Sequence, residues 1–476
     1  MLFNTIDFAI FMPIVFLLYW FVFKKNIKVQ NLFLLFVSYF FYACWDWRFL
    51  GLIFLSSLVD YLVGLSLAKT EQKLKRKVLL VMSLVANLGV LGFFKYYNFF
   101  LESFQDVFLL FGRSLESSSL NILLPVGISF YTFQTLSYTI DVYRKRMEPT
   151  NNILSFFAFV SFFPQLVAGP IERASNLLPQ FERKRLFDYA KSIDGLRLIL
   201  LGLFKKMVIA DNCAIAVNEI FTHHAEYNGS TLFFGAFFFA FQIYGDFSGY
   251  SDIAIGSARL LGFDLMQNFN SPYLSRNLGE FWRRWHISLS TWFRDYVYIP
   301  LGGNQVSKAK WIRNIFVVFL LSGFWHGANW TFIIWGFIHA LFFLPLIFQK
   351  PHKNNKDIAD KGKLLPSVKT IFQIGSTFLI VLVAWVFFRA DNVSHAFMYL
   401  GSMFSKSLFS FPTVSRGLVL FLIVYMVFEW LQRDKKHILE IDFIKSKPLR
   451  IGVYYCLVFI IFYFAGDTQP FIYFQF

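Results

Sequence analysis

Two histidines stand inside a stretch of the sequence that otherwise consists largely of apolar and aromatic residues. His286 belongs to EFWRRWHISLSTWFRDYVYIPLGGN and His326 to FVVFLLSGFWHGANWTFIIWGFIH, both within residues 280–339. An imidazole can take a proton from a hydroxyl or a thiol near neutral pH, because its unperturbed pKa of about 6.5 needs little adjustment. Polar and titratable side chains are costly to place in a bilayer, so this stretch calls for a functional reason.

The residues around His326 favour a break in a membrane helix. Gly323, Gly327 and Asn329 flank the histidine and would let backbone and side chain face a cavity. A continuous helix over residues 311–348 would be about 57 Å long at 1.5 Å per residue. That is too long for one crossing, so the sequence predicts that the helix breaks at these glycines.

The segment that carries His286 is too rich in arginine and serine for a simple span. It is more typical of an interfacial or re-entrant element, and it ends in the turn signal Gly302-Gly303-Asn304. Its residues alone do not distinguish a functional site from a structural turn. A lone histidine in a membrane helix usually packs or forms a hydrogen bond, and His339, between WGF and ALFF, receives that interpretation.

The composition places these motifs in a membrane protein. The 476 residues are 57% hydrophobic, 21% aromatic and 16% charged, with a mean hydropathy of +0.53. A soluble chain carries about 25% charged residues. The net charge of +16 comes from short basic clusters between apolar runs, which indicates positive-inside topology rather than nucleic-acid binding.

Other chemical signatures are missing from the sequence. Cys44, Cys213 and Cys456 are scattered without metal-ligand spacing, so neither a disulfide framework nor a metal site is predicted. The sequence contains no P-loop, no G-x-S-x-G elbow, no H-E-x-x-H motif and no glycine-rich dinucleotide turn.

Hydropathy predicts an all-α, polytopic protein with about 11 to 13 membrane segments, some of them re-entrant, in one domain over residues 1–476. Basic loops, the longest at residues 351–363, alternate with less basic turns and place both termini outside the cytoplasm. The apolar runs lie near residues 4–23, 30–47, 49–68, 78–97, 122–142, 195–221, 231–262, 311–348, 369–388, 416–432 and 451–466.

Polar residues interrupt two further apolar runs. LPVGISFYTFQTLSYTIDVYR carries a series of polar side chains along one predicted span, and hydrogen bonds between helices are the favoured explanation. Asp246 and Asp252 lie in another run, where carboxylates usually pair with a cation. We expect a structural pairing with Arg259 or with a basic residue of the 280–339 stretch rather than direct catalysis.

Taken together, these motifs resemble the membrane-bound O-acyltransferase family, and within it the bacterial alginate O-acetyltransferase branch, which is related to the proteins that transfer D-alanine onto teichoic acids. The resemblance runs in order through LFNTIDF, LPVGISFYTFQTLSYTIDVYR, FFPQLVAGPIER, QIYGDFSGYSDIAIGSARLLGF, FWRRWHISLSTWFRDYVYIPLGG and SGFWHGANWTFIIWG. It weakens after roughly residue 350.

The resemblance implies a helical bundle around a central cavity, with a catalytic core at about residues 122–349. It implies that His326 is catalytic and that His286 is the second site histidine, which would orient or polarise a donor carbonyl. Four residues would support or line the site: Trp325, Asn329, Arg294 and Asp295.

The resemblance also implies a reaction and its setting. Acetyl-CoA or a similar cytoplasmic thioester would acylate a polysaccharide hydroxyl that is reached from the other face of a bacterial inner membrane. A periplasmic acetyltransferase partner would finish the transfer, membrane lipids would surround the chain, and no tightly bound cofactor or metal is expected.

Two other classes of function are also compatible with the sequence. A transporter or flippase for an acyl donor or a lipid-linked sugar would also need a polar-lined cavity in the membrane. A non-catalytic scaffold of a polysaccharide-synthesis complex would need the whole protein but not His326.

Overall fold

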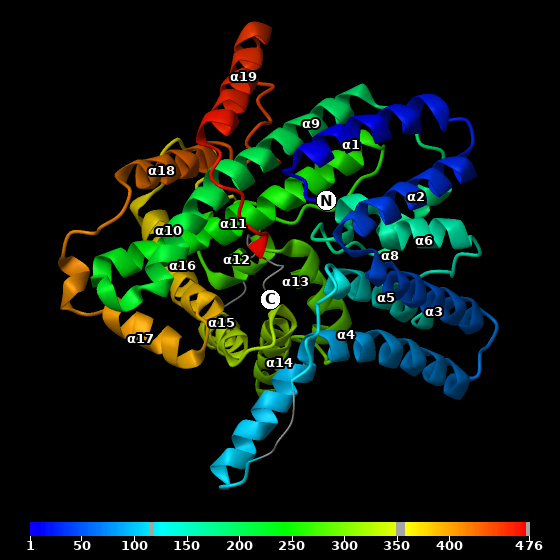
Figure 1. The fold of residues 1–476 in the computed structure, drawn as a ribbon, viewed down its shortest axis with the longest axis horizontal. Helices are drawn as coiled ribbons and strands as arrows, with labels where there is room; N and C mark the ends of the chain where they lie inside the picture. The colour runs from blue at the N-terminus through cyan, green and yellow to red at the C-terminus, as the bar shows by residue number, and fades with distance from the viewer. Residues whose placement is uncertain (115–118, 349–357, 473–476) are drawn as a thin grey trace. The chain divides into compact units, whose positions relative to one another are not determined.

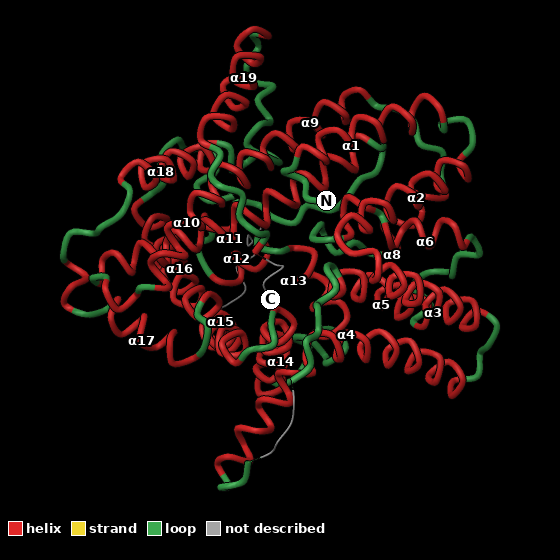
Figure 2. Tube along the Cα trace, in the orientation of Figure 1, coloured by secondary structure: helices red, strands yellow, loops and turns green. Residues whose placement is uncertain are grey.

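The protein is helical wherever the structure describes it. The computed structural model describes residues 1–114, 119–348 and 358–472, and these ranges contain helices, turns and loops but no strand (Figures 1 and 2). The predicted all-α fold is therefore confirmed. The basic loop expected at residues 351–363 falls largely on residues 349–357, which lie outside the described residues.

The helices group into two compact units. The first contains Met1–Gly195 and Ser257–Met266, and the second contains Leu196–Gly256 and Gln267–Phe476. The single domain predicted over residues 1–476, its catalytic core at about 122–349 and its central cavity stay predictions.

The first unit holds the amino-terminal helices. Their bounds are α1 Ile6–Leu17, η1 Leu18–Val22, α2 Ile27–Asp46, η2 Trp47–Phe49, α3 Leu50–Ala68, α4 Lys73–Leu110, α5 Ile128–Tyr143, α6 Ile153–Ser161, α7 Phe163–Leu166 and α8 Ala174–Glu182.

Two helices, α9 Tyr189–Leu203 and α11 Gly229–Leu260, cross the sequence boundary between the units, and the second unit holds the rest. Those are η3 Phe204–Ala210, α10 Asp211–Thr222, η4 His224–Glu226, η5 Pro272–Leu274, α12 Leu278–Arg284, α13 Ile287–Phe293, η6 Arg294–Tyr298, α14 Lys308–His326, α15 Trp330–Phe348, α16 Val368–Arg389, α17 Val393–Met403, η7 Lys406–Phe409, α18 Arg416–Leu431 and α19 Lys447–Phe464.

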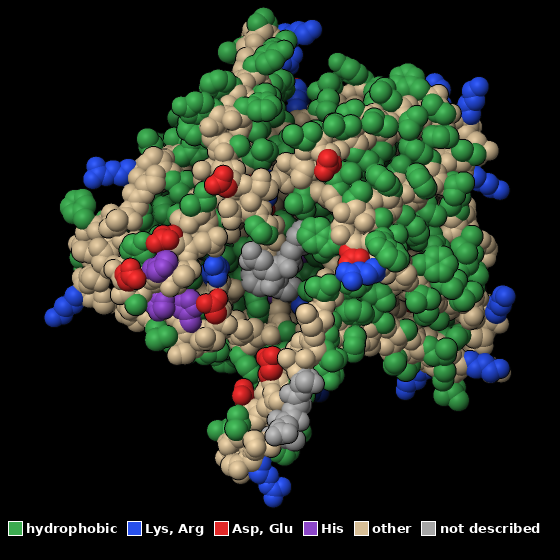
Figure 3. All heavy atoms as spheres, in the orientation of Figure 1, with side chains coloured by type: hydrophobic (Ala, Val, Ile, Leu, Met, Phe, Trp, Pro, Cys, Tyr) green, Lys and Arg blue, Asp and Glu red, His purple; other side chains and the backbone are tan. Residues whose placement is uncertain are grey.

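Five helical stretches of the described chain are long and apolar enough to cross a membrane, judged by length and composition. Hydrophobic side chains cover much of the face of the molecule that Figure 3 shows. The count of 11 to 13 segments stays a prediction. The five stretches are Ile27–Ala68, Lys73–Leu110, Trp330–Phe348, Val368–Arg389 and Lys447–Phe464.

A buried carboxylate joins three helices of the first unit. Asp60 of α3 is 0% exposed and accepts hydrogen bonds from Ser83 and Asn87 of α4 and from Thr139 of α5. Gln134 of α5 donates to a backbone carbonyl of α6 at 2.8 Å. The hydrogen bonds predicted between helices for this polar run are confirmed.

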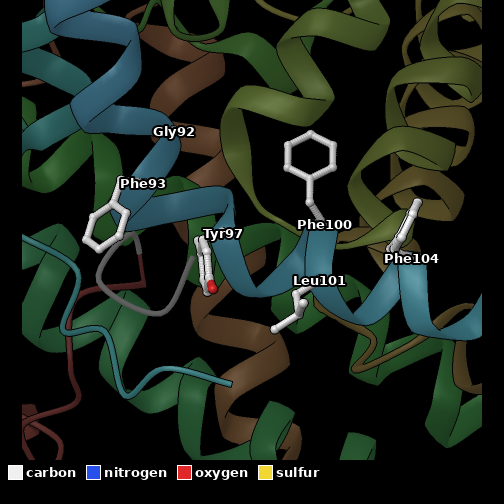
Figure 4. Close-up of a pocket in the computed structure, with 6 residues that line it drawn as sticks. All are labelled: Gly92, Phe93, Tyr97, Phe100, Leu101 and Phe104. Atoms are coloured by element: carbon white, nitrogen blue, oxygen red, sulfur yellow. The ribbon is translucent and has the colours of Figure 1, made fainter. Parts of the chain in front are cut away.

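Beyond this junction, α4 carries an apolar groove. Gly92, Phe93, Tyr97, Phe100, Leu101 and Phe104 line about 550 Å³ of open space along the helix (Figure 4). Its lining is almost wholly hydrocarbon, as is typical of a surface that faces lipid.

Candidate active site

His326 ends helix α14 at the point where the sequence predicts a break. The next residue, Gly327, is extended, with φ −161° and ψ 153°, and α15 begins at Trp330. The predicted break is therefore confirmed. It leaves His326 at a helix terminus, where the backbone carbonyls of the last turn have no partner within the helix.

Aromatic rings enclose the His326 side chain, which is 4% exposed. Its ring centroid lies 4.9 Å from that of Trp325, 5.1 Å from that of Trp335 and 5.3 Å from that of Phe388. These rings come from α14, α15 and α16. Apolar walls of this kind lower the local dielectric, so charges that develop at the imidazole interact more strongly than they would in water.

Two glycines let α14 and α15 cross in backbone contact. A Cβ atom on Gly323 would lie 2.2 Å from the carbonyl oxygen of Phe332, and one on Gly336 would lie 2.3 Å from that of Phe319. Figure 1 shows the two helices side by side. Small residues at such crossings are how membrane helices approach closely, so these glycines fix the end of α14.

Replacement of Gly323 by alanine is expected to force α14 away from α15, three residues before His326. Overpacking of this kind costs about 1 to 3 kcal/mol, so the thermal midpoint of the purified protein in detergent should fall. Gly375→Ala on α16 is the matched control, because a new Cβ there meets nothing within 4 Å. A Gly323→Ala protein that melts no lower than Gly375→Ala would contradict the proposed helix contact.

His286 lies in the short turn between α12 and α13. These helices have 7 residues each, about 10 Å at 1.5 Å per residue, so neither can cross a bilayer. His286 is 0% exposed and has a left-handed backbone conformation with φ 41°. Only a few per cent of non-glycine residues adopt positive φ, so the surrounding contacts must hold this turn in place.

The two histidines come together in the second unit. The ring centroids of His286 and His326 are 6.5 Å apart, and Trp325 lies 6.0 Å from His286. Phe247 of α11 packs edge-on against His286 at 4.6 Å. The structure thus places both predicted catalytic histidines and Trp325 in one buried cluster. We call His286 and His326 the histidine pair, and the aromatic rings around them its walls.

Asn268, in the loop after α11, binds the His286 turn. Its Oδ1 lies 3.1 Å from Nδ1 of His286 and accepts hydrogen bonds from Ser288, from the backbone N–H at 3.2 Å and from the hydroxyl at 2.9 Å. Its amide group donates to Ser251 of α11 at 3.1 Å. The backbone carbonyl of Asn268 also accepts from the N–H of Ile287 at 2.9 Å.

Burial lowers the pKa of His286 to about 3. The residue lies outside the five helices that are long enough to cross a membrane. At physiological pH its imidazole is therefore neutral, and a neutral imidazole has one N–H donor and one lone-pair acceptor.

Residues 148–388 match the model of the membrane-bound O-acyltransferase family, and this segment contains both members of the histidine pair. The chain belongs to this family.

Several relatives support the membership over most of the chain. The probable alginate O-acetylase AlgI of Pseudomonas aeruginosa is 40% identical over 409 residues, which are 86% of this chain and 75% of that protein. The peptidoglycan O-acetyltransferase of Helicobacter pylori is 39% identical over 432 residues, 85% of this chain and 80% of that protein. The teichoic acid D-alanyltransferase of Bacillus subtilis is 32% identical over 292 residues, 58% of this chain and 71% of that protein.

The predicted resemblance to the alginate O-acetyltransferase branch is thus confirmed, and the protein is a multi-pass membrane O-acyltransferase.

Asn329 lies next to the break after His326, where it connects two helices. Its Oδ1 accepts the N–H of Thr331 at 3.0 Å, which caps the start of α15, and its amide donates to the carbonyl oxygen of Asp391 at 2.9 Å. Because Asp391 follows α16, which carries Phe388, Asn329 ties the break to a wall of the histidine pair. Its supporting role stays a prediction.

Arg294 and Asp295 lie on η6, after the short helix α13. Their side chains form an ion pair with each other at 2.8 Å, with Arg294 58% exposed and Asp295 27% exposed. Both are thus more exposed than the histidine pair, and their role at the site stays a prediction.

The acyltransferase pairs both carboxylates of α11 with lysines of η3. Asp252 lies 2.8 Å from Lys205, and Asp246 lies 2.9 Å from Lys206. The predicted structural pairing is confirmed in kind, but the predicted partners are wrong, because Arg259 pairs with Asp194 instead. Two adjacent lysines in an apolar run are costly unless they are paired, and this signal in the sequence could have identified η3.

His339 packs among aromatic rings, as the sequence predicts. It is 0% exposed, with Trp335 at 4.8 Å and Trp282 at 5.0 Å between ring centroids. Neither ring nitrogen has a hydrogen-bond partner among the described residues.

Sequence patterns did not identify three residues that shape the site. Phe388 and Trp335 pack against the His326 ring, and Asn268 binds His286. Hydropathy treats the two aromatic residues like any others in a span, and it treats Asn268 as one polar residue in a loop. Within the part of the chain that the structure describes, no group of three or more His, Cys, Asp or Glu residues could hold a metal ion.

Proposed function

We propose that this acyltransferase moves acetyl groups from a cytoplasmic thioester, acetyl-CoA or a similar donor, toward hydroxyls of an extracytoplasmic polysaccharide. The observation that carries the proposal is the histidine pair, two buried imidazoles whose ring centroids are 6.5 Å apart. Imidazole is the side chain best suited to take a hydroxyl proton near neutral pH.

The names of the relatives support the acetyl group. Those that cover most of this chain are an alginate O-acetylase and a peptidoglycan O-acetyltransferase, each about 40% identical, whereas the D-alanyltransferase is 32% identical. All three names describe acylation of a polymer. We therefore propose acetyl transfer to a polysaccharide oxygen in preference to aminoacyl transfer.

In the proposed reaction, His326 takes the proton of the acceptor hydroxyl as its oxygen attacks the thioester carbonyl. The carbon–oxygen bond forms, the carbon–sulfur bond breaks, and the leaving thiolate receives the proton from the His326 imidazolium. Ester and thiol are the products, so protons balance without a further reactant. General base catalysis of this kind contributes about 10²- to 10⁴-fold in rate.

The cellular setting belongs to the same proposal. The protein lies in a bacterial inner membrane with both termini outside the cytoplasm, in agreement with the alternation of basic loops in the sequence. Where the acceptor hydroxyl of this step belongs to a periplasmic acetyltransferase partner, that partner passes the acetyl group on to the polymer.

Purified protein in lipid vesicles tests the chemistry directly. With an acetyl thioester on one side and a hydroxyl-bearing oligosaccharide on the other, we expect thiol release together with ester formation. Movement of intact thioester or lipid-linked sugar across the vesicle, without thiol release, would instead identify a transporter or flippase.

A further inference from the structure

The side chain of Asn268 contacts a ring nitrogen of His286, Nδ1. Asn268 is 0% exposed, as are His286 and Ser288. A backbone N–H can only donate, so the Asn268 atom that lies 3.2 Å from the N–H of Ser288 must be the carbonyl oxygen, Oδ1. The amide NH₂ then points to the Ser251 hydroxyl, 3.1 Å away.

This orientation determines the tautomer of His286. Oδ1 of Asn268 only accepts hydrogen bonds, and Nδ1 of His286 lies 3.1 Å from it. The Ser288 hydroxyl lies 3.4 Å from Nδ1 but donates to Oδ1 at the shorter distance of 2.9 Å, so the hydrogen between Nδ1 and Oδ1 belongs to Nδ1. In a neutral imidazole the other nitrogen, Nε2, then holds the lone pair.

Resting on the proposed acyl transfer, we infer that Asn268 is a positioning residue. It holds His286 in the Nδ1–H tautomer, so that Nε2 is a hydrogen-bond acceptor for an O–H group next to His326. A nitrogen with a lone pair cannot donate to a carbonyl. His286 therefore supports the reaction as an acceptor, in place of the carbonyl-polarising role expected from the sequence.

The distance between the two rings fits this role. An oxygen that is hydrogen-bonded at about 2.8 Å to one nitrogen of each ring, with a near-tetrahedral angle, separates the ring centroids by roughly 6 to 7 Å. The observed separation is 6.5 Å. A bridging water can thus accept from an N–H of His326 and donate one of its own hydrogens to Nε2 of His286.

Such an arrangement would leave the other nitrogen of His326 as the base. Hydrogen bonds would then run in one direction, from His326 through the bridging oxygen to His286 and from His286 to Asn268. When His326 takes the hydroxyl proton, this chain of dipoles points its negative ends toward the new positive charge. Preorganised dipoles of this kind are a large source of transition-state stabilisation.

Several charged groups of the neighbouring elements form ion pairs of their own. The acids of α11, Asp246 and Asp252, bind Lys206 and Lys205, and Glu280 of α12 binds two arginines. Arg294 and Asp295 of η6 bind each other. From α14, His326 is the titratable ring that faces His286. A charge introduced at position 268 should therefore act chiefly on the histidine pair.

Asn268→Asp and Asn268→Ala distinguish positioning from packing. The Asp carboxylate can accept the same hydrogens, and its negative charge favours protonation of His286. Protonation of His286 removes the Nε2 lone pair. The acidic limb of the pH profile, where activity is lost as the pH falls, should therefore lie at a higher pH in Asn268→Asp than in the unmodified protein. At higher pH Asn268→Asp should keep substantial activity, while Asn268→Ala should lower kcat about 10- to 100-fold, as outer partners of site histidines do, with KM little changed.

Asn26→Asp is the matched control. Asn26 is an exposed N-cap of α2, and aspartate caps equally well, so activity and pH profile should stay unchanged. Equal losses in both Asn268 variants, with the pH profile in place, would overturn the positioning role.

A spectroscopic measurement separates this inference from the proposed function. The ¹⁵N spectrum of histidine-labelled protein, assigned with His286→Gln, should show hydrogen on Nδ1 of His286 and lose that preference in Asn268→Ala. If the protein transfers no acyl group but this signal is present, the proposed function fails and the tautomer assignment stands. If the hydrogen is on Nε2, the inference fails whatever the activity.

Discussion

His326→Gln should lower acyl transfer by about 10²- to 10⁴-fold, the usual contribution of a general base. Glutamine has a similar volume and can form hydrogen bonds, but it cannot take up a proton near neutral pH. Because aromatic rings enclose the site, bulk water is a poor substitute. Polymer ester content in cells and the initial rate of the purified protein, both at equal protein level, measure the loss.

A surface histidine provides the control for this substitution. His223 is about half-exposed and pairs with Glu219, so His223→Gln should leave both measurements unchanged. Full ester content with His326→Gln, combined with complete loss on deletion of the protein, would support the scaffold interpretation instead. A transporter would keep moving its cargo in the variant.

The sequence predicts the helix break at His326 well because the break depends on a local pattern. A run of 38 residues from position 311 is too long for one crossing, and glycines mark where it can end. The requirement that membrane helices satisfy their own backbone hydrogen bonds makes apolar runs easy to find. For the same reason the all-α fold follows from hydropathy.

The surroundings of His286 depend on contacts between distant segments, and no periodic pattern describes these. Asn268 binds His286 across 18 residues of sequence, and Phe388 reaches His326 from another helix. In the sequence, a buried asparagine in a loop looks the same as an exposed one. The positive φ of His286 is likewise invisible in the sequence, because it results from the contacts on both sides of the turn.

The carboxylates of α11 show an intermediate case. The cost of an unpaired charge in a membrane predicts that Asp246 and Asp252 have cationic partners, but it does not say which cations. The structure brings them from η3, where Lys205 and Lys206 are consecutive yet bind different acids. The energetic argument thus predicted the kind of contact, and only the fold determines its geometry.

Lys206→Met is expected to destabilise the protein by about 3 to 5 kcal/mol, as removal of one partner from a buried ion pair does. The Lys206 ammonium lies 2.9 Å from Asp246 and 2.7 Å from Asp211, and it donates to the carbonyl oxygen of Gln469 at 3.0 Å. The side chains of both acids are no more than 3% exposed. Without the lysine, two buried carboxylates would face each other and the carboxyl-terminal segment would lose a contact.

Lys191→Met is the matched control, because Lys191 and Asp264 form an ion pair at 2.7 Å with side chains 51% and 58% exposed. Exposed pairs contribute about 0 to 1 kcal/mol. The thermal midpoint in detergent should therefore fall far more for Lys206→Met than for Lys191→Met, and Asp246→Asn added to Lys206→Met should restore part of the loss by removing one uncompensated charge. Equal midpoints for the two lysine variants would show that the Lys206 pairs do not hold the second unit together.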